Sequence, residues 1–301
     1  MTPTKAAAPV LFMLAAALLW GLWWLPIRWV ESLGITGLWP GVALCLGALP
    51  VTAALALWRR GPWPSRHTLA GAVLIGMAMM LYGGSLSFTD VVRAVLLFYL
   101  APAWSILIEY VWLGRRFRAY DALALGCAIA GIAMITRGEI PLEGAGAVGD
   151  WMALLSGMAW SAGSALIFTG RSLDAYGISL MAVTAAALSG TAIALLAGDV
   201  AGNIGGGPAA VAAAAGAGAL YTAPIILGTV WGAIRLAPAT LSFLLTAEII
   251  SGVGSSALLL DEPFGWIELA GAILIIAGAM VEVFRPDGAA KADAPPGQLG
   301  A

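Results

Sequence analysis

The sequence predicts an all-α protein that crosses a membrane many times. Of its 301 residues, 61% are hydrophobic and 10% are charged, and the mean hydropathy is +0.95. A soluble domain carries roughly 25% charged residues. Runs of about 20 apolar residues, the length that a helix needs to cross a bilayer, recur along the whole chain. Matching segments in its two halves further predict ten transmembrane helices arranged as two inverted five-helix repeats.

Clusters of Gly, Pro and charged residues separate the predicted spans. The apolar run that follows Lys5 is of full length and has no small-residue cleavage site, so it is interpreted as the first span rather than a signal peptide. The segment 286–301, rich in Ala, Pro and Gly, is predicted to be a disordered tail. The ten spans are 10–30, 35–57, 69–88, 91–113, 120–136, 151–169, 178–197, 209–234, 238–260 and 266–284.

The distribution of Lys and Arg predicts the orientation. With both termini in the cytoplasm, only Arg28, Arg93 and Arg137 of the basic residues fall on the outer side. This bias predicts an even number of spans, with the N- and C-termini both in the cytoplasm. Arg28 and Arg93 are expected either to attract a carboxylate at an outer vestibule or to pair with Glu31 and Asp90.

Two segments of the chain match each other at a separation of 147 residues. Segment 260–264 aligns with segment 113–117, and their charges are opposite, because GRRFR is basic and DEPF is acidic. An odd number of spans per copy inverts the second copy, so equivalent loops lie on opposite sides of the membrane. The sequence therefore predicts repeats at 1–137 and 149–285, with a substrate site near the midplane where they meet.

Glu248 lies near the middle of the ninth span, within the apolar run 236–264. A charge at that depth costs at least about 2.5 kcal/mol, so it normally faces a cavity or the interior of the bundle. Ser251 and Ser255 share its helical face. The carboxylate either binds a substrate ammonium or a proton, or it bonds a neighbouring helix and holds the halves in register. Both interpretations stay open.

Aromatic and small polar side chains at helical spacing predict a cage for a flat, amphipathic ligand. Trp and Tyr also favour membrane interfaces and packing, which is the alternative for each ring. Gly83 and Gly84 are candidate hinges, and Pro26 and Pro102 are expected to kink their helices. The predicted substrate-binding residues are Trp20, Trp24, Met79, Tyr82, Tyr99, Trp160, Ser164, Tyr221, Phe243 and Glu248.

Three segments carry a resemblance to a known family: LLWGLWWLPIRWVESLG, FTDVVRAVLLFYLAPAWSILIEYVWLGRRF and SSALLLDEPFGWIELAGAILIIAGAMV. They resemble the drug/metabolite transporter superfamily in its EamA-type, ten-helix exporter branch. This resemblance implies a multi-pass protein of the bacterial cytoplasmic (inner) membrane. Trp20 with Ile27 and Arg28, and Tyr99 before Pro102, are most similar to YddG-type aromatic amino-acid exporters. Family members carry an acidic residue after the fourth and ninth spans. Glu262 matches this pattern, whereas Arg115 departs from it, so a symmetric carboxylate pair is not implied.

These observations predict a secondary transporter that exports aromatic amino acids or similar metabolites. A multidrug exporter with the same fold is the alternative, because an aromatic cavity also accepts lipophilic cations. The sequence contains no GxxxxGK[ST] phosphate loop, and a single histidine with no HExxH motif makes an intramembrane enzyme the remote alternative. We expect no cofactor, metal or nucleic acid, a small-molecule substrate, contact with the lipid bilayer, and function as a monomer. Coupling to protons and passive export both stay open.

Overall fold

The protein is all-helical in its computed structural model. The structure describes residues 3–61, 64–112, 114, 116–136, 138, 145–169, 174–198, 202–236, 244–260, 262 and 264–283. Within these residues, the β pairing consists of a single antiparallel bridge between Ile35 and Ile204. The predicted all-α class is therefore confirmed.

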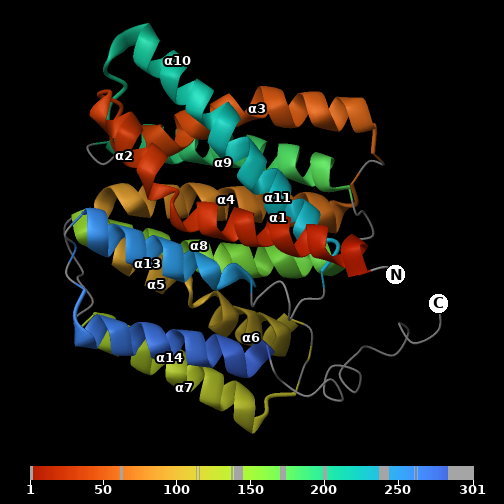
Figure 1. The fold of residues 1–301 in the computed structure, drawn as a ribbon, viewed down its shortest axis with the longest axis vertical. Coiled ribbons are helices and arrows are strands. Elements are labelled where there is room, and N and C mark those ends of the chain that lie inside the picture. The colour runs from red at the N-terminus through yellow and green to blue at the C-terminus, as the bar shows by residue number, and fades with distance from the viewer. Residues whose placement is uncertain are drawn as a thin grey trace.

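The helices lie roughly side by side in one bundle (Figure 1). They are α1 (Pro3–Gly21), α2 (Trp24–Ser32), α3 (Trp39–Arg59), α4 (Arg66–Phe88), α5 (Val91–Phe98), α6 (Ala101–Trp112), α7 (Ala119–Ile135), α8 (Ala145–Thr169), α9 (Ala175–Leu196), α10 (Gly207–Ala217), the π-helical segment η2 (Gly218–Thr222), α11 (Ala223–Ala233), α13 (Ala247–Leu259) and α14 (Trp266–Val283).

Each predicted span coincides with a helix or with a broken helix. The first corresponds to α1 and α2, the fourth to α5 and α6, and the eighth to α10, η2 and α11. Residues 237–243, in the predicted ninth span, lie outside the described residues. By length and composition, five described stretches can each cross a bilayer, the bent pair α1 and α2 makes a sixth, and α7, α13 and α14 are shorter apolar helices. These helices fit a multi-pass membrane protein, and the count of ten stays a prediction.

The surface of the bundle carries many large apolar side chains. Leu57, Ile129, Leu196, Leu220 and Trp266 are all exposed, although they lie on five different elements. Soluble monomers rarely expose large contiguous apolar patches. A surface of this kind is suited to contact with lipid tails.

The centre of the bundle is built on α4, which packs along α8 and also against α9. A Cβ atom added to Gly71 on α4 would lie 2.7 Å from the carbonyl oxygen of Gly163 on α8, so the two backbones touch. Small residues allow this close approach between membrane helices. On one side of this centre, α1 contacts α11 and α13, and α5 contacts α8 and α13. The pair α7 and α14 forms one edge of the bundle (Figure 1).

Polar side chains begin several helices. The Ser65 hydroxyl accepts the Thr68 N–H at 3.2 Å before α4, and the Asp174 carboxylate accepts the Gly177 N–H at 2.9 Å before α9. Such caps bond backbone donors that the first helical turn leaves free. The end of the bundle where α4 gives way to α5 and where α8 begins is called the Asp150 end below.

Candidate functional site

Five helices, which belong to three of the predicted spans, begin or end near the middle of the bundle. α1 and α2 meet at Leu22 and Trp23 with a bend of 41°. α5 ends at Phe98 and α6 begins at Ala101, while α13 begins at Ala247 after a turn at Thr246. Pro26 and Pro102 lie in the first turn of α2 and α6, where a residue without an N–H interrupts the hydrogen bonds of a longer helix. Both prolines therefore lie at breaks, as the sequence predicts, whereas a role in gating stays a prediction.

Glu248 lies in the first turn of α13 and is 3% exposed. The Tyr99 hydroxyl lies 3.1 Å from its Oε2 and also bonds the Leu245 carbonyl oxygen. The Tyr82 hydroxyl faces the same carboxylate. A buried carboxylate needs such partners, because burial without them is costly. Glu248 is thus enclosed by phenol groups from α4 and from the break after α5.

Gly21 brings the break in α1 against the start of α13. A Cβ atom at Gly21 would lie 2.4 Å from the Glu248 carbonyl oxygen and 2.1 Å from the Ser251 hydroxyl. No side chain fits in that space, so the α1 backbone rests directly on the turn that holds Glu248. The pairing of a glycine with this turn fixes the distance between α1 and α13.

A continuous series of aromatic rings leads across the bundle to Glu248. Tyr82 packs against Phe98 with ring centroids 4.9 Å apart, and Phe98 contacts Tyr99 at 5.6 Å and Trp160 at 6.1 Å. Offset and edge-to-face contacts at these distances are favourable. The aromatic cluster, as we name it below, consists of Trp20, Trp23, Tyr82, Phe98, Tyr99 and Trp160.

The structure brings together four of the rings that the sequence predicts, Trp20, Tyr82, Tyr99 and Trp160, with Glu248 beside Tyr82 and Tyr99. Two members, Trp23 and Phe98, are missing from the predicted set, although they join the other four. Trp23 lies in the break three residues before Pro26, and Phe98 lies four residues before Pro102. These two prolines are the signal that could have identified them, because a break changes which side chains point inward.

Further predicted residues bond across the two halves of the sequence. Each of these bonds joins α1, or the first residue of α2, to an element of the second half. The π-helical segment that contains Tyr221 is also typical of functional sites. The bonds run from Trp20 Nε1 to Thr229 Oγ1 (2.8 Å), from Trp24 Nε1 to Ser255 Oγ (3.0 Å) and from the Tyr221 hydroxyl to the Leu19 carbonyl oxygen (2.8 Å).

The remaining predicted residues have different surroundings. Met79 is buried in the hydrophobic core, and Ser164 is exposed. Gly83 faces the Trp23 ring, whereas a Cβ atom at Gly84 would meet Met152 and Leu38. Phe243 lies outside the described residues.

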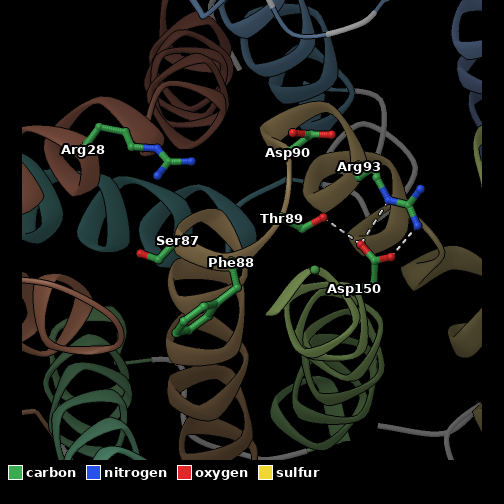
Figure 2. Close-up of a pocket in the computed structure, with 8 residues that line it drawn as sticks. Arg28, Ser87, Phe88, Thr89, Asp90, Arg93 and Asp150 are labelled. Atoms are coloured by element: carbon green, nitrogen blue, oxygen red, sulfur yellow. Dashed lines mark hydrogen bonds and ion pairs between the residues drawn. The ribbon is translucent and has the colours of Figure 1, made fainter. Parts of the chain in front are cut away.

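A pocket of about 400 Å³ opens at the Asp150 end (Figure 2). Arg28 lies across it from Arg93 and Asp150, and Arg28 Nη1 pairs with Glu31 Oε2 at 3.0 Å. The pairing of Arg28 with Glu31 is as the sequence predicts. The pocket is lined by Arg28, Ser87, Phe88, Thr89, Asp90, Arg93, Gly146 and Asp150.

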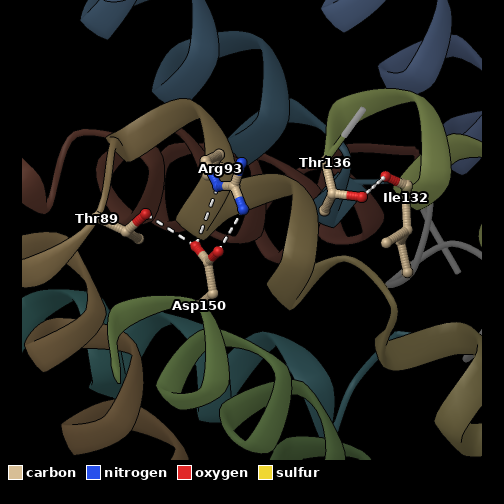
Figure 3. A network of polar contacts seen from close by, with 5 residues as sticks. All are labelled: Thr89, Arg93, Ile132, Thr136 and Asp150. Atoms are coloured by element: carbon tan, nitrogen blue, oxygen red, sulfur yellow. Dashed lines mark hydrogen bonds and ion pairs between the residues drawn. The ribbon is translucent and has the colours of Figure 1, made fainter. Parts of the chain in front are cut away.

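The partner of Arg93 differs from the prediction. Arg93 forms a bidentate ion pair with Asp150 rather than pairing with Asp90 (Figure 3). The contact from Arg93 Nε to Asp150 Oδ1 is 3.1 Å long. The Thr89 hydroxyl donates to the same carboxylate at 2.8 Å. Asp150 lies in the second turn of α8, and because α8 packs against α5, its carboxylate reaches Arg93. A second contact in Figure 3, from Thr136 to the Ile132 carbonyl oxygen, lies within one helix end.

Glu262 also binds the first turn of α5 at the Asp150 end. Its two carboxylate oxygens accept the N–H groups of Val91 and Val92 at 2.8 and 2.9 Å. These donors form the first turn of α5, where the helix dipole also favours a negative charge. Glu262 and Asp150, both from the second half of the sequence, therefore hold residues 89–93 of the first half.

The described residues contain no group of three or more His, Cys, Asp or Glu side chains that could hold a metal ion. Chemically, the central site offers a carboxylate, phenol and indole donors and several ring faces. These groups can bind an organic cation by charge and by cation–π contact, and they can enclose a planar apolar group.

Comparisons with known proteins agree with the fold. No protein with a curated description matches the chain. Seventeen chains from solved structures do, and one of them, described only as "Crystal structure of protein", has 18% sequence identity and a TM-score of 0.57 over 91% of this chain and 96% of its own. At this identity the likeness establishes the fold alone. In the first half of the sequence, residues 7–137 match the model of the EamA-like transporter family.

Proposed function

We propose that this protein is a secondary transporter that exports amphipathic metabolites, and aromatic amino acids above all, by alternating access. The observation that carries the proposal is the buried Glu248 carboxylate at the end of the aromatic cluster, where the breaks of three helices meet. The match of residues 7–137 to a transporter family supports a transport function, and the cluster supports an aromatic substrate.

An inverted-repeat architecture for residues 1–137 and 149–285 is part of the proposal. In such an architecture, each span is equivalent to the span five places along the chain. The contact of α4 (third span) with α8 (sixth span) is then equivalent to that of α11 (eighth span) with α1 (first span), and the contact of α6 with α8 is equivalent to that of α13 with α1. All four pairs are in contact. The pairs α3 with α9, α5 with α13 and α7 with α14 map onto themselves, and they also pack together.

The positions of the helix breaks support the same symmetry. Tyr99, in the break between α5 and α6, and Thr246, in the turn before α13, are 147 residues apart, which is the separation of the matching sequence segments. Broken helices that cross at the repeat interface are a common way to build a midplane site in transporters. The Tyr99 hydroxyl crosses this interface to reach Glu248.

In this arrangement the central site is separated from the predicted outer side. α5 packs against α13 between the central site and the Asp150 end, and Glu262 and Asp150 bind residues 89–93 there. A substrate that reaches Glu248 would therefore enter from the opposite, predicted cytoplasmic side. Release to the outside requires α5 and α13 to separate.

The alternative substrate class is a lipophilic cation, which the Glu248 carboxylate and the surrounding rings would also accept. Counterflow into proteoliposomes separates the two classes. Vesicles preloaded with phenylalanine should accumulate labelled phenylalanine above the level of empty liposomes, and Glu248→Gln vesicles should not. Accumulation of tetraphenylphosphonium but of no aromatic amino acid would favour the alternative. Accumulation of neither compound would contradict both functions.

A further inference from the structure

The Trp23 indole N–H is a buried donor in the aromatic cluster with no hydrogen-bond partner among the described residues. The side chain is 1% exposed. Buried polar groups are nearly always bonded, so an unbonded donor in a packed interior needs an explanation. A ligand that accepts a hydrogen bond from this N–H when it binds would explain the unpaired donor.

The neighbouring donors are already engaged. Trp20 Nε1 bonds Thr229 at 2.8 Å, and the Tyr99 hydroxyl bonds the carbonyl oxygen of Leu245 and approaches Glu248. A ligand acceptor that reached these groups would have to displace a protein partner. Trp23 can donate without breaking an existing bond, and this distinguishes it from the rings on either side.

The position of Trp23 connects it to the carboxylate. Its ring centroid lies 6.1 Å from that of Tyr82, whose hydroxyl faces Glu248. Tyr82 therefore borders both the indole and the carboxylate. A ligand that displaces side chains around Tyr82 would have the Glu248 carboxylate on one side, as the partner for a cation, and the Trp23 indole on the other, as a neutral donor.

Gly83 leaves a small space beside the ring. Trp23 lies in the break between α1 and α2, outside both helices. Its rim faces Gly83, where a Cβ atom would be 3.4 Å from Cη2 and 3.6 Å from Cζ3. Because glycine has no side chain, the space beside the rim stays open for the indole to tilt. This gives the predicted hinge glycine a second role, as the residue that leaves room for Trp23.

We propose that Trp23 determines substrate specificity: its indole N–H donates a hydrogen bond to the carboxylate of an aromatic amino acid whose ammonium group is bound by Glu248. This inference rests on the proposed transport function. It explains how one site would distinguish a zwitterion from a lipophilic cation, because the cation needs only Glu248. The N–H provides the partner for the second charge without placing a second ion in the bundle.

The test compares phenylalanine with phenethylamine, which has the same ring and ammonium group but no carboxylate. Each compound competes with labelled phenylalanine in counterflow, and the readout is the ratio of the two inhibitory concentrations. Loss of a hydrogen bond to a charged group should weaken the binding of phenylalanine by about tenfold or more. In Trp23→Phe the preference for phenylalanine over phenethylamine should fall by that factor, with phenethylamine unchanged.

Two further variants keep the result specific. Replacing Trp23 with 3-benzothienylalanine keeps the size of the ring and removes only the N–H, so it should give the same change in the ratio without creating a cavity. Trp104→Phe removes another buried indole N–H that has no hydrogen-bond partner among the described residues; Trp104 lies outside the aromatic cluster, so this variant should leave the ratio unchanged. An unchanged ratio in both Trp23 variants, or an equal fall in Trp104→Phe, would overturn the inference. If the unmodified protein shows no phenylalanine counterflow, the proposed function is overturned, and this inference with it.

Discussion

The contact between Glu262 and the first turn of α5 should control how often the Asp150 end opens. The perturbation is Glu262→Gln, which removes the charge and one of the two acceptor oxygens that bind the N–H groups of Val91 and Val92. The shape of the side chain stays almost the same. Because Glu262 lies in the second half of the sequence and α5 in the first, these bonds exist only when the two halves are together at this end.

The size of the effect follows from these two bonds. A hydrogen bond to a charged group contributes about 1.5–3 kcal/mol, and the partial exposure of Glu262 reduces the contribution of its charge. A net loss of about 2 kcal/mol changes an equilibrium constant by about 30-fold. Glu262→Gln should therefore raise the population that is open at the Asp150 end by about that factor.

The assay uses a cysteine at a position that is buried only when this end is closed. Val95 on α5 is fully buried, and its Cγ2 faces Gly252 on α13. With Cys45 and Cys127 replaced by serine, Val95→Cys should react with a membrane-impermeant maleimide at a rate proportional to the open population. Glu262→Gln should raise this rate by about 30-fold.

Glu31→Gln is the matched control, because Glu31 lies at the same end but pairs with Arg28 within the first half. It should leave the reaction rate of the cysteine unchanged. Equal rates in Glu262→Gln and the unmodified background would refute the reasoning. An equal increase in Glu31→Gln would show that any lost carboxylate loosens this end.

Three further predictions concern the centre of the bundle. Gly21→Ala places a methyl group 2.1 Å from the Ser251 hydroxyl, so we expect overpacking to lower stability by about 1–3 kcal/mol and transport to fall, whereas Gly126→Ala, with no neighbour within 4 Å, should preserve the melting temperature. Glu248→Gln should abolish phenylalanine counterflow because a neutral amide cannot form an ion pair with an ammonium group. Near-normal counterflow with a lower melting temperature would assign Glu248 a structural role instead. Thr229→Val leaves the Trp20 indole unbonded and should destabilise the protein by about 1–3 kcal/mol in thermal unfolding, and an unchanged melting temperature would contradict this bond.

The sequence identified the parts of the site that depend on local spacing. The length of the apolar runs predicts helices, and helical periodicity places Tyr82 and Trp160 on inward faces. Periodicity fails where a helix breaks. It puts Trp20 and Trp24 on one face, but the turn at Leu22 and Trp23 brings Trp23 into contact with Trp20, while Trp24 bonds Ser255.

Pairings between distant segments are the other part that sequence reasoning missed. Asp90 is the nearest acidic residue to Arg93 along the chain, but the packing of α8 against α5 brings Asp150 closer. The partners of Glu262 are backbone N–H groups, which every residue except proline carries, so no side-chain pattern marks them. Both contacts depend on how the halves pack, and local sequence contains little of that information.

The bonds between the two halves are arranged differently around α1 and around α5. Side chains bond α1 to α11 and η2 through Thr229 and Tyr221, and they bond the first residue of α2 to α13 through Ser255. The hydrogen bonds from α5 and its break to α13 and the loop after it come from the Tyr99 hydroxyl at the central site and from the Glu262 cap at the Asp150 end.

A ligand shifts a conformational equilibrium only by as much as it binds one state better than the other. On the proposed mechanism, a substrate ammonium that pairs with Glu248 competes directly with Tyr99 for that carboxylate. Binding would then weaken the contact that holds the break after α5 to α13, and the Glu262 cap would be left to keep the outer end closed. Substrate occupancy and opening would then be coupled through the Tyr99 phenol group, so Glu262→Gln should open further when phenylalanine is bound than when it is absent.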